Sequence, residues 1–518
     1  METVIGLDFG NENSYAVFIS GIDRRTRKGG NVKWLVPSDQ QKGIPSVVHV
    51  DKLGVRRYGF VATQFRPAKN RRNMLKFRLD TTEEIGGFTV DYNVEITNLV
   101  KHIVDEANKI LRAQNHGETT DRIALAYPVS YTDGQRDKLV ELIENVTLED
   151  GRKLKVVGKI KESEAAALAY LSEANFGEGE QNYTVLVYDL GAGTFDASVV
   201  TAHQTDKGTI DNYEVLRNRG VRRGGREIDA ITADLIRNDC HTLGVELRDS
   251  DAANDELMRR AERIKILLSD EDHYEYVIDE EDDDGPSFEI TREDLEAATE
   301  ELIMETIQAT RELYDQVPIK PDRIVMVGGQ SQMPVIRAML AREFPDIGED
   351  NIVLFRPHQA IAEGAARFGT LQRQRSRAVT AVTLRTGHMI GIGHVLINSA
   401  NPSEGTQVQT LIESNSRIPL EHEAVYTFHN HEPATSQTVV FYQAKVDNPN
   451  LRGNADGSYS DFTEITRLTI DYNVSQPAIL DFQIVVNIDS LGNLTFEARD
   501  PRGVFQPAVS DRINVARG

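Results

Sequence analysis

Two segments far apart in the chain share one design that could hold a phosphate and its metal ion. VIGLDFGN (4–11) and VLVYDLGAGTFD (185–196) are apolar runs that each reach an aspartate and then glycines. Because glycine has no Cβ, backbone N–H groups beside it can come within hydrogen-bonding distance of a phosphate. A carboxylate at the strand end, Asp8 or Asp189, can hold a hydrated Mg²⁺, the ion that usually accompanies phosphates. Two such loops predict a nucleotide held between two lobes.

A third glycine turn follows another apolar strand later in the chain. IVMVGGQ, residues 324–330, again runs from apolar residues into glycines. The aspartate-glycine design itself recurs after about 180 residues, which predicts two related lobes. The third turn could then carry the other end of the nucleotide.

The elements that must position these loops alternate between strand and helix over residues 1–370. Such alternation is typical of α/β architecture. The predicted strands are 4–8, 14–19, 123–127, 185–189, 195–200 and 324–327, and the predicted helices are 95–113, 134–146, 163–174, 226–243, 252–270 and 292–315.

The pattern changes at about residue 371, where the polar, basic stretch LQRQRSR begins a predicted linker over 371–387. Residues 388–518 hold short runs such as TVVFYQAKV and RLTIDYNV, separated by turns rich in glycine and asparagine. Alternating polar and apolar residues are typical of half-buried strands. We therefore predict a β-sandwich domain in this region, with no helical segment after it.

Composition limits what kind of protein this chain can be. Its 518 residues exceed the roughly 100–200 of one domain, and an apolar fraction of 40% is enough for packed cores. The net charge of −23 disfavours general binding to nucleic-acid phosphates or anionic membranes. The chain has one cysteine, Cys240, no evident secretory signal and no apolar stretch of about 18 residues. We expect a cytoplasmic protein without nucleic-acid or membrane partners.

Two dense charge runs are predicted to be exposed turns. DEEDDDG at 279–285 lies between strand-like segments, and its carboxylates lack the alternate spacing of a calcium loop. This run is therefore predicted to form a solvated hairpin tip. The basic cluster DRRTRKGG at 23–30 is interpreted in the same way.

Several segments, taken in chain order, resemble those of the heat-shock protein 70 chaperones within the actin-like ATPase superfamily. DLGAGTFD is close to the family's DLGGGTFD, ESEAAALAY (162–170) to its NEPTAAALAY, and RGGREID (223–229) to its LGGEDFD. The further matches are YPVSYTDGQR (127–136), AERIKILLS (261–269), VGGQSQMP (327–334) and AIAEGAA (360–366). The resemblance implies a two-lobed actin-like ATPase domain over residues 1–370. The β-rich remainder is similar to the family's peptide-binding sandwich.

The resemblance implies catalytic roles for five residues. Lys76 would approach the γ-phosphate of ATP, and Glu162 would orient the attacking water. Thr194 would lie beside the γ-phosphate, and Asp196 would help to hold a K⁺ ion or the nucleophile. Asp189 would act through Mg²⁺. Phosphoryl transfer needs this kind of charge neutralisation and water positioning more than it needs a covalent nucleophile.

The resemblance also implies ATP or ADP as the bound nucleotide, with Mg²⁺ held through water by Asp8 and Asp189. Glu262, Lys265 and Ser269 are spaced three and four residues apart, so they share one helix face. These three match the family's ribose and adenine contacts. The remaining implied nucleotide contacts are Gly10, Asn11, Glu12, Asn13, Gly191, Ala192, Gly193, Gly224, Gly225, Gly328, Gly329 and Gln332.

The sequence departs from the family's pattern at several positions near these loops. Asn11 and Glu12 stand where the family carries two threonines, and Glu12 would repel phosphate if it points inward. Gln332 replaces an arginine that packs on adenine, Arg226 replaces a glutamate, and His358 replaces an acidic residue. We expect these changes to alter nucleotide affinity and turnover more than the fold.

The linker and the β-rich region carry the expectations about polypeptide binding. Residues 376–387 lack the leucine run of typical members, so coupling between the domains is expected to be weak. Alternate residues of a strand face inward, so about half of the candidate peptide contacts are expected in the sandwich core. Those candidates are Leu411, Val425, Tyr426, Phe428, Val439 and Phe441.

Three functions remain open from the sequence. The first is an ATP-dependent chaperone, a slow ATPase that binds extended apolar polypeptide. A J-domain co-chaperone and a nucleotide exchange factor are its implied partners. The second is an interaction module that binds ATP, hydrolyses it poorly and docks one fixed protein partner. The third is a small-molecule kinase of the actin-like superfamily, which explains the phosphate loops but not the β-rich region.

Overall fold

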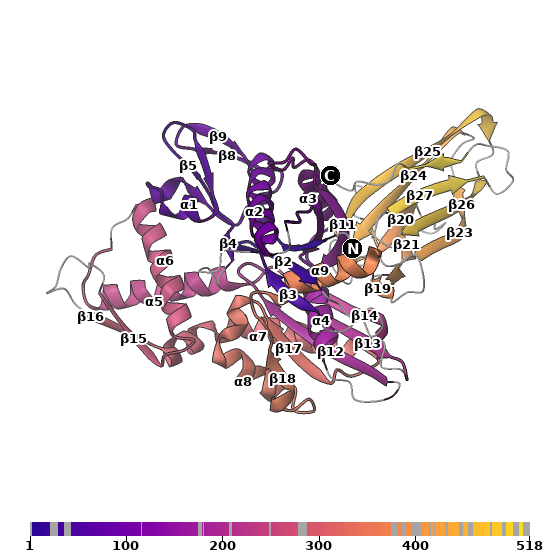
Figure 1. Ribbon diagram of the computed structural model, residues 1–518. Coiled ribbons are helices and arrows are strands. Elements are labelled where there is room, and N and C mark those ends of the chain that lie inside the picture. Colours follow the sequence, from indigo (N-terminus) through magenta and orange to yellow (C-terminus); the bar gives the residue numbers. More distant parts are fainter. Residues whose placement is uncertain are drawn as a thin grey trace. The chain divides into compact units, whose positions relative to one another are not determined.

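The computed structural model describes most of the chain between residues 3 and 510 (Figure 1). The segments outside the described residues are 1–2, 21–29, 36–42, 115–116, 175–178, 180, 207–209, 248–249, 278–286, 374–380, 386–388, 396–405, 414–415, 419, 430–433, 445–448, 454–458, 477–478, 489–493, 501–506 and 511–518. Contacts divide the chain into two compact units. The first holds residues 1–130, 142–213 and 217–381, and the second holds 131–141, 214–216 and 382–518.

Two sheets with the same strand order form the centre of the first unit. One runs β11-β10-β1-β2-β3, and the other contains the path β18-β17-β12-β13-β14. In both, the opening strand pairs in parallel with a later strand and antiparallel with the next one. This shared topology is the repeat that the two aspartate-glycine segments predict. The strands are β1 (Ile5–Asp8), β2 (Asn13–Ser20), β3 (Asn31–Trp34), β10 (Arg122–Tyr127), β11 (Lys155–Lys161), β12 (Gln181–Leu190), β13 (Phe195–Gln204), β14 (Ile210–Val221), β17 (Arg323–Val327) and β18 (Ile352–Leu354).

The predicted helices are confirmed, with small changes at their ends. Helix 252–270 ends earlier, at Leu267, because the next backbone groups close a tighter turn: the Ser269 and Asp270 N–H groups donate to the carbonyls of Ile266 and Leu267. Ser269 therefore lies just beyond the helix. The helices are α1 (Gly59–Gln64), α2 (Tyr92–Gln114), α3 (Asp133–Glu144), α4 (Glu162–Glu173), α5 (Gly225–Thr242), α6 (Asp251–Leu267), α7 (Arg292–Gln316), α8 (Pro334–Glu343) and α9 (Ala360–Arg373).

Helices α4 and α9 pack closely against each other and against the central strands. A Cβ at Gly364 of α9 would lie 1.7 Å from the Ala165 carbonyl oxygen of α4. A Cβ at Gly6 of β1 would lie 2.1 Å from the Ala362 carbonyl oxygen. Since no side chain fits at either position, glycine allows the close backbone approach that holds β1 and α4 in place.

Small hairpins complete the first unit. β15 (His273–Val277) and β16 (Ser287–Thr291) pair antiparallel, so the hairpin predicted around the acidic run is confirmed, while its tip lies outside the described residues. The basic run at 23–29 also lies outside them. The remaining short strands are β4 (Ile44–Pro45), β5 (Val48–Val50), β6 (Arg56–Tyr58), β7 (Arg71–Arg72), β8 (Thr82–Ile85) and β9 (Phe88–Asp91).

The second unit contains two four-stranded antiparallel sheets, ordered β21-β20-β24-β25 and β23-β26-β27-β28. Phe441 of β24 and Phe496 of β27 are fully buried, with ring centroids 4.2 Å apart, so the two sheets share one core. The domain boundaries near residues 370 and 388 stay predictions. The strands are β19 (Ala381–Arg385), β20 (Ile390–Val395), β21 (Thr406–Ile412), β22 (Arg417–Ile418), β23 (Leu420–His429), β24 (Ala434–Ala444), β25 (Phe462–Gln476), β26 (Ile479–Ile488), β27 (Leu494–Arg499) and β28 (Ala508–Val509).

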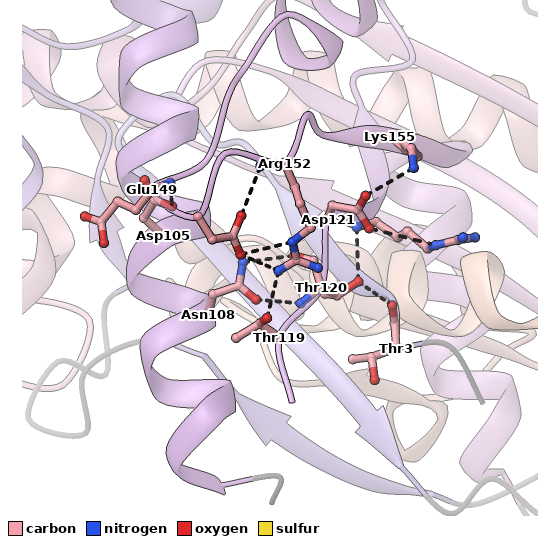
Figure 2. Close-up of polar contacts among 11 residues, drawn as sticks. Thr3, Asp105, Asn108, Thr119, Thr120, Asp121, Glu149, Arg152 and Lys155 are labelled. Carbon is pink, nitrogen blue, oxygen red and sulfur yellow. Dashed lines mark hydrogen bonds and ion pairs between the residues drawn. The ribbon is translucent and has the colours of Figure 1, made fainter. Parts of the chain in front are cut away.

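A buried polar network fixes α2 to the segments that enter β1 and β10 (Figure 2). The Asn108 side chain accepts from the Thr120 N–H at 2.8 Å and donates to the Thr120 carbonyl at 2.9 Å. The Thr120 hydroxyl donates to the Thr3 carbonyl at 2.6 Å. At the edge of the network, Arg152 donates to the Thr119 hydroxyl at 2.7 Å. Asn108 thus satisfies backbone groups that no neighbouring strand reaches.

Replacing Asn108 with alanine is expected to lower the free energy of unfolding of the first unit by about 2 kcal/mol. The substitution leaves the buried Thr120 N–H and carbonyl without a partner, and each such loss costs about 1–3 kcal/mol. The measurement is urea unfolding followed by circular dichroism. Asn238→Ala, at an exposed position of α5, is the matched control and should change stability by about 0.5 kcal/mol or less. Equal stability of both variants would contradict the assigned role of the network.

Candidate functional site

The loops at the ends of β1, β12 and β17 open onto one cavity of about 240 Å³ in the first unit. Residues far apart in the chain meet there because the repeated sheets place the ends of their opening strands toward the same space. The predicted residues that line this cavity are Asp8, Gly10, Asn11, Glu12, Asn13, Lys76, Glu162, Asp189, Gly191, Ala192, Thr194, Glu262, Lys265, Ser269, Gly328, Gly329 and Gln332.

Four predicted site residues, Gly193, Asp196, Gly224 and Gly225, form the wall behind the cavity rather than its lining. A Cβ at Gly224 would lie 2.6 Å from the Gly193 nitrogen, and the Gly225 N–H donates to the Gly191 carbonyl at 2.9 Å. These glycines bring the start of α5 against the second phosphate loop. Asp196 accepts from the Val129 N–H at 3.2 Å. The three glycines therefore contribute the shape of the loop, because only residues without a Cβ allow this close backbone packing.

The second loop, residues 191–194 between β12 and β13, leaves room for a ligand beside its backbone. A Cβ at Gly191 would meet only the Thr194 carbonyl oxygen, at 3.5 Å, although Gly191 lines the cavity. A Cβ at Gly328 would instead lie 2.3 Å from the Leu190 carbonyl, and the φ of Gly328 is +82°. Gly328 is thus required by the protein's own backbone, whereas Gly191 is adjacent to free space in the cavity. This is the arrangement expected of a loop whose N–H groups approach a phosphate.

A cluster of carboxylates surrounds one buried lysine at the base of the cavity. The Lys76 ammonium lies 2.5 Å from Glu162 Oε1, and both side chains are buried. Lys76 belongs to a short 3₁₀ helix (Leu75–Arg78) that the Met74 N–H ties to the Asn11 carbonyl at 3.0 Å. The carboxylates of Asp8 and Asp189 are also buried. One cation therefore faces more than one negative charge.

The excess of negative charge disfavours ionisation of these carboxyls. Burial raises the pKa of Asp8 to about 7, and the charge of Glu162 adds to this effect. Burial and the charges of Glu162 and Asp196 raise the pKa of Asp189 well above its usual value. The pKa of Asp196 is raised by the same causes, burial first and Glu162 second. The cluster would be stabilised by added positive charge.

Mg²⁺ fits this donor set. It is bound in proteins by one or two carboxylates together with waters and substrate phosphates. Asp8 and Asp189 are the carboxylates at the two loop ends, and both carry like-charge neighbours that a divalent cation would offset. Among the described residues, no group of three or more His, Cys, Asp or Glu side chains is placed to hold a metal ion directly.

The opposite wall of the cavity comes from α6 and two loops. The Lys265 ammonium lies 2.6 Å from Asp229 Oδ1 of α5, and both groups are buried. The Ser269 hydroxyl donates to the Lys265 carbonyl at 3.3 Å. Gln332 Nε2 donates to the Gly329 carbonyl at 3.1 Å and lies 3.2 Å from His358 Nε2.

Several cavity residues were not predicted as site residues. Ile266 and Asp270 lie four residues after Glu262 and Ile266 respectively, so extending the same helical spacing could have found them. Tyr15 and His358 also line the cavity, with stacked rings whose centroids are 6.2 Å apart. No local spacing connects these two. The other unpredicted lining residues are Gln330, Met333, Pro357 and Ile361.

The candidate peptide contacts divide between the core and the surface of the second unit. Leu411, Val439 and Phe441 are buried in the sandwich core, which makes them structural residues. Val425 is 58% exposed and can meet a ligand. Tyr426 is partly buried and lies on the opposite face of the strand, opposite the buried Phe482. The side chain of Phe428 lies outside the described residues.

Comparisons with known proteins agree with this architecture. The family model described as Hsp70 protein matches residues 95–450. The chain is 26% identical to a chaperone protein DnaK of Buchnera aphidicola over 93% of this chain and 76% of the relative. It is 30% identical to chaperone protein DnaK of Psychrobacter cryohalolentis over 64% of this chain and 50% of the relative. It is 27% identical to chaperone protein HscA of Photorhabdus laumondii over 70% of this chain and 57% of the relative.

The chain belongs to the Hsp70 family, because the family model covers more than half of it. The α/β fold and the family resemblance inferred from the sequence are thereby confirmed. The chain spans only about half of the length of two of these relatives. Within the described parts of the chain, the helices are too short or too polar to cross a bilayer.

Proposed function

We propose that this protein is an ATP-dependent chaperone: it binds ATP with Mg²⁺ in the first unit, hydrolyses it slowly, and binds extended apolar polypeptide through the β-sandwich. The observation that carries the proposal is the convergence of both aspartate-glycine loops and the Lys76–Glu162 pair on one cavity. Family membership supports it, since members of this family are typically nucleotide-dependent chaperones.

The residues around the cavity divide the chemistry between them. Mg²⁺, when held by Asp8 and Asp189, would neutralise charge on the transferred phosphate. Lys76 supplies a buried cation at the same place, and Glu162 fixes its ammonium at 2.5 Å. Glu162 can also orient the attacking water, since a carboxylate has two accepting oxygens. Thr194 hydrogen-bonds Asp196, which keeps both side chains at the loop where K⁺ or the nucleophile would lie. Such preorganised charge is the main source of catalysis in phosphoryl transfer.

Saturating MgATP is expected to raise the melting temperature of the first unit by about 3 °C or more. A ligand at a hundred times its Kd that binds only the folded state stabilises it by about 2.7 kcal/mol. The measurement is differential scanning calorimetry of the full chain with MgATP, MgGTP and Mg²⁺ alone. An unchanged melting temperature at millimolar MgATP would remove the nucleotide function.

One observation favours the second candidate, an ATP-binding module with little turnover. Asn11 Oδ1 is buried and has no hydrogen-bond partner among the described residues, and the neighbouring Glu12 carboxylate lines the cavity. The family's threonine hydroxyls are therefore replaced by groups that do not donate in the same way. Phosphate release under saturating MgATP separates the two candidates, because only the chaperone ATPase releases more than one phosphate per chain.

We infer that the polypeptide partner meets the exposed side of the β-sandwich. Val425 of β23 is exposed there, whereas the partly buried Tyr426 next to it points to the opposite face of the strand. Apolar groups on a strand favour an extended partner, since such a partner presents alternate side chains. A J-domain co-chaperone and a nucleotide exchange factor are further partners that the family suggests. A small-molecule kinase activity has no structural feature in its favour beyond the shared phosphate loops.

A further inference from the structure

Glu12 occupies a position where a negative charge opposes the proposed ligand. It lies in the turn between β1 and β2, and its backbone carbonyl accepts from the Ser46 N–H at 2.7 Å. Its side chain lines the nucleotide cavity and also an adjoining cavity of about 250 Å³. Glu262 is the other residue that lines both. A nucleotide whose phosphates meet the first loop therefore arrives beside the Glu12 carboxylate.

The cations around Glu12 neutralise its charge only in part. Glu262 and Lys265 face it from α6, and Asp229 and Arg226 face it from α5. Lys265 is engaged by Asp229 at 2.6 Å, and Arg226 is exposed. The three acidic groups thus share one buried ammonium.

Further charged groups near Glu12 belong to the neighbouring elements. Arg71 of β7 and Arg259 of α6 line the adjoining cavity, and the Tyr15 phenol of β2 is influenced by the charge of Glu12. Arg259 also donates to Glu256, which engages part of its charge.

We propose that Glu12 makes nucleotide binding conditional on proton uptake: the polyphosphate is accepted when the Glu12 carboxyl is protonated and is opposed when it is ionised. The inference rests on the proposed nucleotide function and names a specificity-determining residue of the same site. The Glu12 carboxyl selects against negative charge at a position where the family's threonine would donate a hydrogen bond. A protonated carboxyl restores one O–H donor there.

The direction of the pH effect follows from the two states of the site. Burial, reinforced by Glu262, raises the pKa of Glu12 to about 7 without nucleotide. Bound phosphate adds negative charge and raises this pKa further. Binding then takes up a proton at Glu12 between the two pKa values, so Glu12 opposes binding least below about pH 7. Above it, affinity falls by up to tenfold per pH unit until the pKa of the bound state is reached.

The test is isothermal titration calorimetry of the full chain with MgADP from about pH 6 to about pH 8.5. Each pH is measured in two buffers of different ionisation enthalpy, which gives the number of protons taken up. The first variant is Glu12→Gln, which removes the charge. The second is Glu12→Thr, which introduces the family's residue and replaces the first variant in the titration if that variant does not fold. Glu300→Gln removes one exposed charge of α7 and is the matched control.

Near pH 8, wild type and Glu300→Gln should take up close to one proton more than Glu12→Gln and Glu12→Thr, because protons released by the other carboxyls of the site are common to all four proteins. At that pH the two Glu12 variants should bind MgADP about tenfold more tightly than wild type, since one pH unit above a pKa of about 7 corresponds to that factor. Equal proton uptake and equal pH profiles in wild type and the Glu12 variants would overturn this inference alone. Absence of MgADP binding in every protein at every pH would overturn the nucleotide function and this inference together.

Discussion

Asp189→Asn is expected to lower ATP turnover by about 100-fold while leaving the fold intact. The asparagine keeps the size of the side chain but removes the charge that would hold Mg²⁺ at the second loop, and losing one preorganised electrostatic group typically costs about 10²–10³ in rate. The measurement is steady-state phosphate release under saturating MgATP. Asp234→Asn, on the exposed face of α5, is the matched control.

The stability of the same variant separates a catalytic effect from a folding defect. The pKa of Asp189 is raised in the folded protein, so its ionised form costs stability at pH values above its unfolded pKa. Asparagine removes that cost, so Asp189→Asn should melt no lower than wild type at neutral pH. Unchanged turnover in Asp189→Asn and in Thr194→Ala would contradict the roles assigned to these two residues, and an absence of turnover in wild type would favour the binding module over the ATPase. Loss of turnover together with a lower melting temperature would indicate a folding defect instead.

Gly191→Val is expected to abolish the stabilisation of the first unit by MgATP. At this position a Cβ meets only the Thr194 carbonyl, at 3.5 Å, so the empty protein tolerates a side chain that would occupy the cavity beside the loop. The melting temperature without nucleotide should stay within about 2 °C of wild type, because no packed side chain is displaced. The shift with MgATP, about 3 °C or more in wild type, should disappear.

The matched control for this variant is Gly151→Val at an exposed turn. Nothing lies within 4 Å of a Cβ at Gly151, although its φ of +85° means that some strain accompanies the change. That control should keep the full MgATP shift even if it melts lower. A normal shift in Gly191→Val would show that phosphate does not occupy the second loop.

The arrangement of the phosphate loops could be predicted because it depends on local patterns. Apolar strands that end in Asp8 and Asp189 recur at the start of two similar halves, and related halves place equivalent strand ends alike. The structure shows this as two sheets of identical order. Helices α2 to α7 were also predictable, since each has a periodic apolar pattern, whereas α1, α8 and α9 were not predicted. The ends of the helices were less predictable. Helix α6, for example, ends at Leu267 because a tighter turn competes with the last helical turn.

Contacts between distant segments could not be derived from spacing. Lys76 and Glu162 are 86 residues apart and belong to a 3₁₀ helix and to the first turn of α4. Family resemblance, not periodicity, assigned both to the site. The approach of Gln332 to His358 depends on two loops that follow different strands. Whether Glu12 points into the cavity depends on the conformation of a short turn that the sequence leaves open.

The β-rich region shows a similar division. Its alternating strands were predictable, and Phe441 and Phe496 occupy the core that such strands must share. The alternation alone does not predict which face of each strand packs into the core. Leu411 and Val439 are therefore buried, whereas Val425 is exposed, although all three belong to strands with similar patterns.

Titrating MgATP into the full wild-type chain in a calorimeter shows directly whether the cavity of the first unit binds MgATP. Near pH 7 we expect saturable binding of one nucleotide per chain, a loss of affinity when Mg²⁺ is chelated, and no saturable heat with Gly191→Val. The absence of saturable heat in wild type up to millimolar MgATP would contradict this expectation. Equal binding by wild type and Gly191→Val would contradict it as well.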